Sequence, residues 1–131
     1  LSVNGQASVL VPYVHSGSYY LTVRHRNSIE TTSAVPISMS SNTVNYAFDA
    51  PSKAYGNNLL MMISGEYVIF GGDANQDGII DTGDMTLVDN SAASFTIGYV
   101  NSDVNGDGVV DTSDMTIIDN NASGFVVSIT P

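Results

Sequence analysis

An acidic segment of twelve residues occurs twice in this chain, and the duplication limits what the second half can fold into. The first copy spans residues 73–84 and reads DANQDGIIDTGD, and the second spans residues 103–114 and reads DVNGDGVVDTSD. In each copy, side chains with oxygen atoms stand at positions 1, 3, 5, 9 and 12, and glycine stands at position 6. The similarity continues to Phe95 and Phe125, so one supersecondary unit is used twice. One such unit cannot bury its apolar face alone, but two units can bury their apolar faces against each other.

This spacing of oxygen atoms is that of the EF-hand calcium loop, with Asp in place of the usual Glu at position 12. Alternate positions direct side chains to the inside of a tight turn, and Gly78 and Gly108 permit that turn because they lack a Cβ atom. A short Asp at position 12 also suits Mg²⁺, but a loop without an entering helix can adjust to the larger ion, so Ca²⁺ is favoured. We therefore expect two Ca²⁺ ions, with a metal-free acidic turn as the alternative.

The carboxylates of each loop are expected to make folding depend on the metal. Like charges about 5 Å apart repel by on the order of 3 kcal/mol at an effective dielectric of about 20, and a small protein is stable by only about 5–15 kcal/mol. We expect the C-terminal part to be loose without calcium and folded with it.

Charge and composition exclude several classes of partner. The net charge is −10, and the only Lys and Arg residues are Arg24, Arg26 and Lys53, which argues against nucleic acids and anionic membranes. There is no cysteine, so metal is the available substitute for disulfides. No apolar run is long enough to span a bilayer. No leader precedes Leu1, and we interpret the chain as part of a larger one.

Residues 1–70 are predicted to form an antiparallel β-sandwich. Runs of alternating or β-branched residues are separated by turn-forming Gly, Asn and Ser. The expected strands lie in Ala7–Val14, Gly17–Arg26, Ile29–Met39, Thr43–Phe48 and Tyr67–Phe70. In the second of these runs, His25 is expected to be a packed or surface strand residue, and Arg24 and Arg26 on the opposite face are expected to stay solvated.

Residues 71–131 are predicted to contain a short helix behind each loop. The apolar stretches Met85–Val88 and Met115–Ile118 each allow about two helical turns. Thr82 and Thr112 are the expected N-caps, and Asp-Asn pairs at 89–90 and 119–120 are expected to end the helices. The predicted packing places Met85, Val88 and Phe95 against Met115, Ile118 and Phe125. Ile80 and Val110 are expected to pair across the two loops as a short β-bridge.

The tandem loops, each followed but not preceded by a helix, resemble the type I dockerin family over about residues 72–125. The resemblance implies a first ion bound by Asp73, Asn75, Asp77, the carbonyl oxygen of Ile79 and Asp84, with Asp81 acting through water. It implies a second ion bound by Asp103, Asn105, Asp107, the carbonyl oxygen of Val109 and Asp114, with Asp111 acting through water. The β part is similar to prealbumin-like or Ig-like accessory domains that accompany such modules.

The same resemblance implies a non-catalytic role in protein–protein docking. Type I dockerins attach secreted enzymes, often polysaccharide-degrading ones, to cohesin partners on a scaffold or cell surface, so an extracellular or cell-surface location is expected. The positions that read the partner correspond here to Thr82, Gly83, Asp89, Asn90, Thr112, Ser113, Asp119 and Asn120. Many dockerins carry Lys-Arg where this chain has Asp-Asn, and the near-identity of the two units would permit binding in two orientations.

Two other functions remain open from the sequence. Calcium-stabilised packing of the loops on the β part would make the module structural, with no docking partner. The seven tyrosines could serve a carbohydrate-binding accessory domain, although aromatic residues in strands are ordinarily core or cross-strand partners. Paired-carboxylate catalysis is disfavoured because the loop spacing already accounts for the Asp residues.

Overall fold

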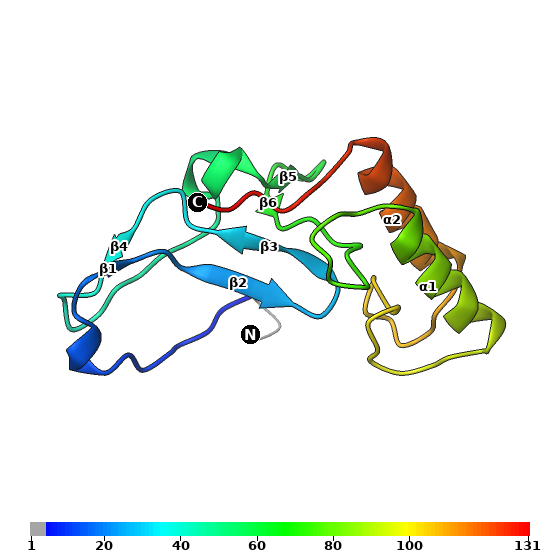
Figure 1. The fold of residues 1–131 in the computed structure, drawn as a ribbon, viewed down its shortest axis with the longest axis horizontal. Coiled ribbons are helices and arrows are strands. Elements are labelled where there is room, and N and C mark those ends of the chain that lie inside the picture. Colours follow the sequence, from blue (N-terminus) through cyan, green and yellow to red (C-terminus); the bar gives the residue numbers. More distant parts are fainter. Residues whose placement is uncertain (1–4) are drawn as a thin grey trace.

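A computed structural model describes residues 5–131. The N-terminal part contains short β-strands and 3₁₀ helices, and the C-terminal part contains two α-helices that lie side by side (Figure 1). The strands are β1 (Ser18–Tyr19), β2 (Thr22–His25), β3 (Ser28–Thr32), β4 (Ile37–Ser38), β5 (Leu60–Met61) and β6 (Tyr67–Val68). The 3₁₀ helices span Tyr13–His15, Pro51–Lys53 and Tyr55–Asn57. The α-helices are α1 (Thr82–Ala93) and α2 (Thr112–Ser123).

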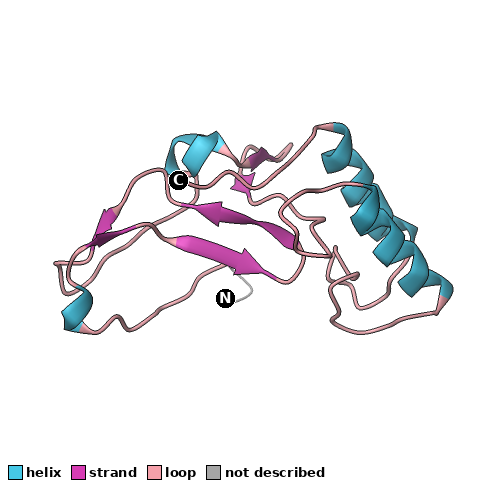
Figure 2. Ribbon diagram, viewed as in Figure 1, coloured by secondary structure: helices cyan, strands magenta, loops and turns pink. Residues whose placement is uncertain are grey.

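Within residues 5–131 the strands form three separate antiparallel pairs, which are β1–β4, β2–β3 and β5–β6. The predicted sandwich of two packed sheets is therefore not confirmed in the described residues (Figure 2). The strands predicted at Ala7–Val14 and Thr43–Phe48 are wrong, because both segments are irregular apart from the 3₁₀ turn at Tyr13–His15. Alternation of apolar residues supplies one face of a strand but no partner, and side chains such as Leu10 and Val14 remain exposed.

The β2–β3 hairpin is the longest strand pair, and it brings the N-terminal part to the loops. Its turn consists of Arg26 and Asn27, and its register shifts between Val23 and His25. The backbone N–H of Ile29 donates to the carbonyl oxygen of Phe70 at 3.1 Å, and the N–H of Gly72 donates to the carbonyl oxygen of Asn27 at 2.7 Å. The hairpin is thereby hydrogen bonded to the segment that enters the first loop.

Each α-helix begins with a capping box made by two aspartates of its loop. The side chain of Asp81 accepts from the N–H of Gly83, and the side chain of Asp84 accepts from the N–H of Asp81. Asp111 and Asp114 repeat this arrangement at α2. The prediction that Thr82 and Thr112 are the N-caps is wrong by one position, because the aspartate carboxylate supplies the acceptor that the free N–H groups require.

Both helices are longer than predicted, and a phenylalanine with a left-handed backbone follows the C-cap of each. The Asp-Asn pairs at 89–90 and 119–120 lie inside the helices rather than ending them. Phe95 (φ 53°) and Phe125 (φ 54°) follow the last turns, where the N–H groups of Thr96 and Val126 bond back to the carbonyl oxygens of Ser91 and Asn121. This arrangement is the Schellman type of helix end.

The predicted packing between the helices is correct in its centre and wrong at the two phenylalanines. Val88 and Ile118 are fully buried, and Met85 and Met115 pack against the same cluster. Phe95 and Phe125 are instead 89% and 88% exposed. The left-handed turn at each helix end leaves these rings outside the core.

The core is shared between the two parts of the chain. Its buried members are Ile29, Ile80, Val88, Val110 and Ile118. Ile29 comes from β3, whereas the other members come from the loops and helices, so residues 5–70 contribute directly to the packing of the helical part. No helix among residues 5–131 combines the length and the apolar character needed to cross a membrane.

Each loop is hydrogen bonded to the segment that follows the other repeat's helix, rather than to the other loop. The N–H of Ile80 in the first loop donates to the carbonyl oxygen of Val126, beyond α2. The N–H of Val110 in the second loop donates to the carbonyl oxygen of Thr96, beyond α1. The predicted bridge between Ile80 and Val110 is therefore wrong, because each loop finds its partner in the extended segment that follows the other repeat's helix.

The C-terminal segment connects the first loop to the N-terminal part. After Val126 it runs back along β3, as the red trace in Figure 1 shows. Thr31 and Ile129 form a parallel bridge, and the N–H of Glu30 donates to Ser128 Oγ at 3.1 Å. The N–H of Ser128 donates to the carbonyl oxygen of Gly78 at 2.7 Å. Residues 126–129 thus contact the first loop and the hairpin together.

Candidate metal centre

The first loop is held in a tight turn by hydrogen bonds from its backbone to its own polar side chains. Asp84 Oδ1 accepts from the N–H of Asn75 at 3.1 Å, and Asn75 Oδ1 accepts from the N–H of Asp77 at 2.9 Å. Asp77 Oδ1 accepts from the N–H of Ile79 at 2.9 Å. Gly78 has φ +86°, a conformation that favours glycine. Positions 3, 5 and 12 of the loop are therefore oriented by the turn itself.

The second loop repeats these bonds position by position. Asp114 Oδ1 accepts from the N–H of Asn105 at 3.0 Å, Asn105 Oδ1 from the N–H of Asp107 at 2.8 Å, and Asp107 Oδ1 from the N–H of Val109 at 2.8 Å. Gly108 has φ +87°. The duplication seen in the sequence is thus a duplication of local structure.

Position 1 of the first loop holds a buried carboxylate that lacks a full set of partners. Asp73 is 3% exposed, and its Oδ2 accepts from the N–H of Gly78 at 3.2 Å. Its Oδ1 is buried and has no hydrogen-bond partner within residues 5–131. Burial raises the pKa of Asp73 above its ordinary value of 3.8, and the neighbouring charges of Asp84 and Asp77 raise it further. An unpartnered buried carboxylate oxygen is a group that a cation would satisfy.

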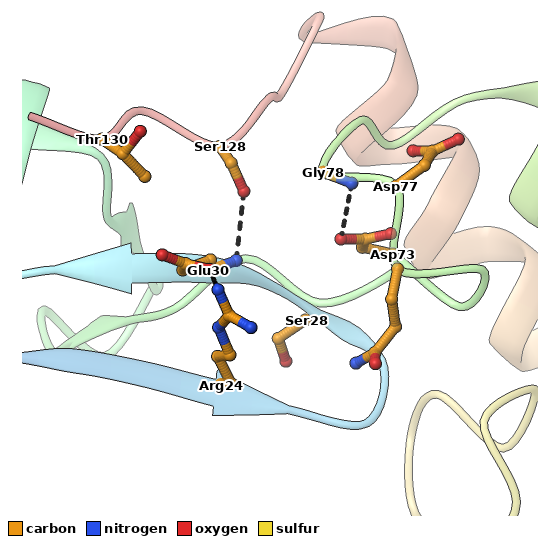
Figure 3. Close-up of a pocket in the computed structure, with 9 residues that line it drawn as sticks. Arg24, Ser28, Glu30, Asp73, Asp77, Gly78, Ser128 and Thr130 are labelled. Atoms are coloured by element: carbon orange, nitrogen blue, oxygen red, sulfur yellow. Dashed lines mark hydrogen bonds and ion pairs between the residues drawn. The ribbon is translucent and has the colours of Figure 1, made fainter.

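A cavity of about 270 Å³ lies beside this carboxylate, between the hairpin and the first loop. Figure 3 shows Asp73 on one side, bonded to Gly78, and the ion pair of Arg24 with Glu30 on the other. Ser128 of the C-terminal segment closes a further side. The first loop therefore opens onto a polar recess lined by both parts of the chain.

Position 1 of the second loop lies beside the guanidinium group of Arg26. Asp103 is fully buried, and its Oδ1 accepts from the N–H of Gly106 at 2.9 Å. Arg26 at the tip of the hairpin donates to the carbonyl oxygen of Asp103 at 2.7 Å and lies 3.5 Å from its Oδ2. Asn27 Nδ2 donates to the same carbonyl oxygen at 2.8 Å. The expectation that Arg26 is solvated is wrong, because the turn places its side chain against this loop.

The sequence gives little indication of this contact. Arg26 and Asn27 resemble any polar hairpin turn, and the second loop lies far away along the chain. Arg24, by contrast, is exposed as expected and pairs with Glu30. His25 is a partly buried strand residue, as expected, and its Nδ1 lies 3.0 Å from Asn27 Oδ1.

The two loops present the donor types that calcium requires, although their carboxylates do not converge on one point. Within residues 5–131 no group of three or more His, Cys, Asp or Glu side chains is assembled so that it could hold a metal ion. Most of these carboxylate oxygens accept hydrogen bonds from backbone N–H groups or from the neighbouring Asn amide, as at Asp77. The free Oδ1 of Asp73 and the glycines at position 6 fit a calcium loop, because oxygen ligands around a tight turn are its chemistry.

The aspartates at position 9 of the two loops are also the N-cap residues of the two α-helices. Asp81 and Asp111 are exposed and cap the helices. The hydroxyl and the N–H of Ser113 both donate to Asp111 Oδ1, which lowers the pKa of Asp111 below 3.8. Both aspartates thus remain at the loop surface, where water can reach them.

All eight residues at the partner-reading positions lie on the surface. They are the four exposed residues Thr82, Gly83, Asp89 and Asn90 of α1 and the four exposed residues Thr112, Ser113, Asp119 and Asn120 of α2. The hairpin contacts the loops and leaves both sets open. Residues 71–131 contain ten Asp and no Lys, Arg or His, so these faces have no cation of their own module nearby.

Comparison with known families identifies the duplicated module. Residues 71–123 match the family model described as the dockerin type I domain. This match confirms the resemblance drawn from the loop pattern, over the part of the chain that carries it. Dockerin domains are non-catalytic modules for calcium-dependent protein–protein docking. The match does not extend to residues 1–70, and no curated protein and no solved structure matches the chain.

Proposed function

We propose that the C-terminal module binds two Ca²⁺ ions and docks a larger secreted protein to a cohesin-like partner. The observation that carries this proposal is the position-by-position repetition of the loop hydrogen bonds, at Asn75, Asp77 and Asp84 and again at Asn105, Asp107 and Asp114. Two loops with the same internal hydrogen bonds, each joined to a helix with an exposed face, would supply two calcium sites and two similar docking faces.

In this proposal each ion is bound by three side chains at positions 1, 3 and 5, one backbone carbonyl oxygen at position 7 and the Asp at position 12. Position 9 contributes through water. A bound ion supplies positive charge that offsets the repulsion among the loop carboxylates. The Asp at position 12 would link the ion to the helix, because Asp84 and Asp114 also cap α1 and α2.

The docking faces are acidic, which defines the chemistry of the partner. Asp89 on α1 and Asp119 on α2 occupy equivalent exposed positions. A cohesin-like surface with Lys or Arg opposite these positions would complement them, and association would weaken as salt is raised. A partner attached in this way places the protein outside the cell or on its surface, where polysaccharide-degrading enzymes carry such modules.

A second candidate function is structural, and it is favoured by the packing of the hairpin on the loops. Ile29 lies in the core of the helical part, and residues 126–129 connect the first loop to β3. In this alternative the two calcium ions stabilise a unit of residues 1–70 and 71–131 without any partner.

Binding to a panel of cohesin modules, measured by biolayer interferometry with calcium and with chelator, separates these functions. Docking predicts binding in calcium alone. It also predicts that Asp89→Lys and Asp119→Lys are each tolerated, because the other face remains, whereas the double variant loses binding. Absence of binding to every cohesin, with both loops loaded with calcium, would support the structural alternative.

A further inference from the structure

The two loops share their internal hydrogen bonds but differ in what faces the carboxylate at position 1. In the first loop, Asp73 Oδ1 is buried without a partner in residues 5–131. In the second loop, Asp103 faces the guanidinium group of Arg26. The sequences of the loops would not predict this difference, because Arg26 comes from the hairpin.

Arg26 is held against the second loop by contacts from several sides. Its guanidinium carbon lies 3.5 Å from the ring centroid of Tyr99, a cation–π geometry. Its side chain is 15% exposed, and that of Asp103 is fully buried. The hydroxyl of Tyr99 lies 3.4 Å from His25 Nε2, next to Arg26 in the hairpin. The charge of Arg26 is therefore largely removed from water and fixed at the edge of the loop.

A fixed, partly buried charge acts strongly on its neighbours, because screening by water is reduced. The positive charge of Arg26 offsets the negative charge of the second loop when no metal is bound. The same charge opposes a cation that binds to Asp103. Among residues 5–131 no arginine is paired with the position-1 carboxylate of the first loop: Arg24 lines the same cavity as Asp73, but it is 78% exposed and pairs with Glu30.

We infer that Arg26 is an internal counter-ion for the second calcium loop, so that this loop stays assembled without calcium and binds calcium more weakly than the first loop. This inference rests on the proposed calcium binding. It makes the near-identical loops unequal, with the first loop filling first as calcium rises and the second filling at higher calcium.

The test is a calcium titration of the whole chain followed by amide NMR, in which Gly78 and Gly108 report on the first and second loops separately. In the wild type, the Gly78 signal is expected to reach saturation at lower calcium than the Gly108 signal. Arg26→Gln keeps a hydrogen-bond donor but removes the charge, and it is expected to raise the affinity of the second loop about tenfold. Arg26→Lys keeps the charge and is expected to leave the affinity near that of the wild type.

The matched control is Arg24→Gln, in the same hairpin, which is expected to leave the calcium affinity of the second loop unchanged. If neither glycine responds to calcium in the wild type, the proposed calcium binding fails and the inference fails with it. If both respond but Arg26→Gln leaves the affinity at Gly108 unchanged or lowers it, calcium binding stands and the inference is overturned.

If Arg26→Gln does not fold, hydrogen exchange of the wild-type protein tests the role of Arg26 without a variant. The amides of Ile80 and Val110 make equivalent hydrogen bonds in the two repeats. In the metal-free wild type, hydrogen exchange is expected to be slower at Val110 than at Ile80, because Arg26 holds the second loop together. Equal protection, or faster exchange at Val110, would contradict the role of Arg26.

Discussion

Replacing Asp73 with Asn should have opposite effects with and without calcium. In the metal-free protein, Asp73 is buried, its Oδ1 lacks a partner in residues 5–131, and it lies near the charges of Asp77 and Asp84. An asparagine is neutral and can still accept the hydrogen bond from Gly78. Burying a polar group without a partner costs about 1–3 kcal/mol and burying a charge costs more, so removal of the charge should stabilise the metal-free protein by about 1–3 kcal/mol. For a chain of this size, that corresponds to a rise in Tm of roughly 4–12 °C in chelator.

With calcium the same substitution should be harmful, because position 1 of the first loop loses its charged ligand. Calcium at about 100 times its dissociation constant stabilises the folded state by about 2.7 kcal/mol per site, and this contribution from the first loop would be lost. Thermal unfolding followed by circular dichroism, in calcium and in chelator, measures both effects. Asp103→Asn is the matched control: it should not stabilise the metal-free protein, because it leaves Arg26 without its ionic partner.

The dependence on pH provides a further check on Asp73. Because burial raises its folded pKa above 3.8, the metal-free folded state binds a proton more tightly than the unfolded state. The contribution of Asp73 to stability should therefore grow as the pH falls through the raised pKa towards 3.8, and this increment should be missing in Asp73→Asn. A variant that is less stable than the wild type in chelator at neutral pH would refute the reasoning.

Three further sets of changes should separate local contributions. Deleting residues 126–131 should lower the free energy of unfolding by several kcal/mol, which denaturant unfolding measures. This segment supplies backbone partners for the first loop and for β3, and its Val126 side chain packs against the core cluster. Phe95→Gly and Phe125→Gly should each raise stability by about 1 kcal/mol in thermal unfolding, since glycine adopts the left-handed conformation without strain and the exposed ring contributes little packing. Asp84→Asn and Asp114→Asn should each remove one calcium ion, measured by calorimetric titration, and retention of both ions would contradict the role of position 12.

The duplicated loops could be predicted from the sequence because their geometry is set locally. Side chains at alternate positions bond to backbone groups two residues away, as Asn75 does to Asp77, so the pattern of residue types determines the turn. The helices behind the loops were predictable for the same reason. Their N-caps were misplaced by one position because Asp and Thr can both accept the capping hydrogen bond, and the sequence does not decide between adjacent acceptors.

The structure of the N-terminal part, and its contacts with the C-terminal part, could not be predicted in the same way. Ala7–Val14 has the composition of a strand, but a strand requires a partner, and alternation of residues does not provide one. The contact of Arg26 with Asp103 joins residues far apart in the chain and depends on how the hairpin packs. Phe95 and Phe125 were predicted to be buried because they are large and apolar, whereas the backbone at the helix ends turns them outward.

The most direct test of the central claim is the number of calcium ions that the intact chain binds. Native mass spectrometry after exchange into calcium should show two bound ions, and chelator should remove both. Asp84→Asn and Asp114→Asn should each leave one ion, and the double variant should leave none. A wild-type mass without bound calcium, in a sample whose circular dichroism shows it to be folded, would contradict the assignment of the two loops as calcium sites.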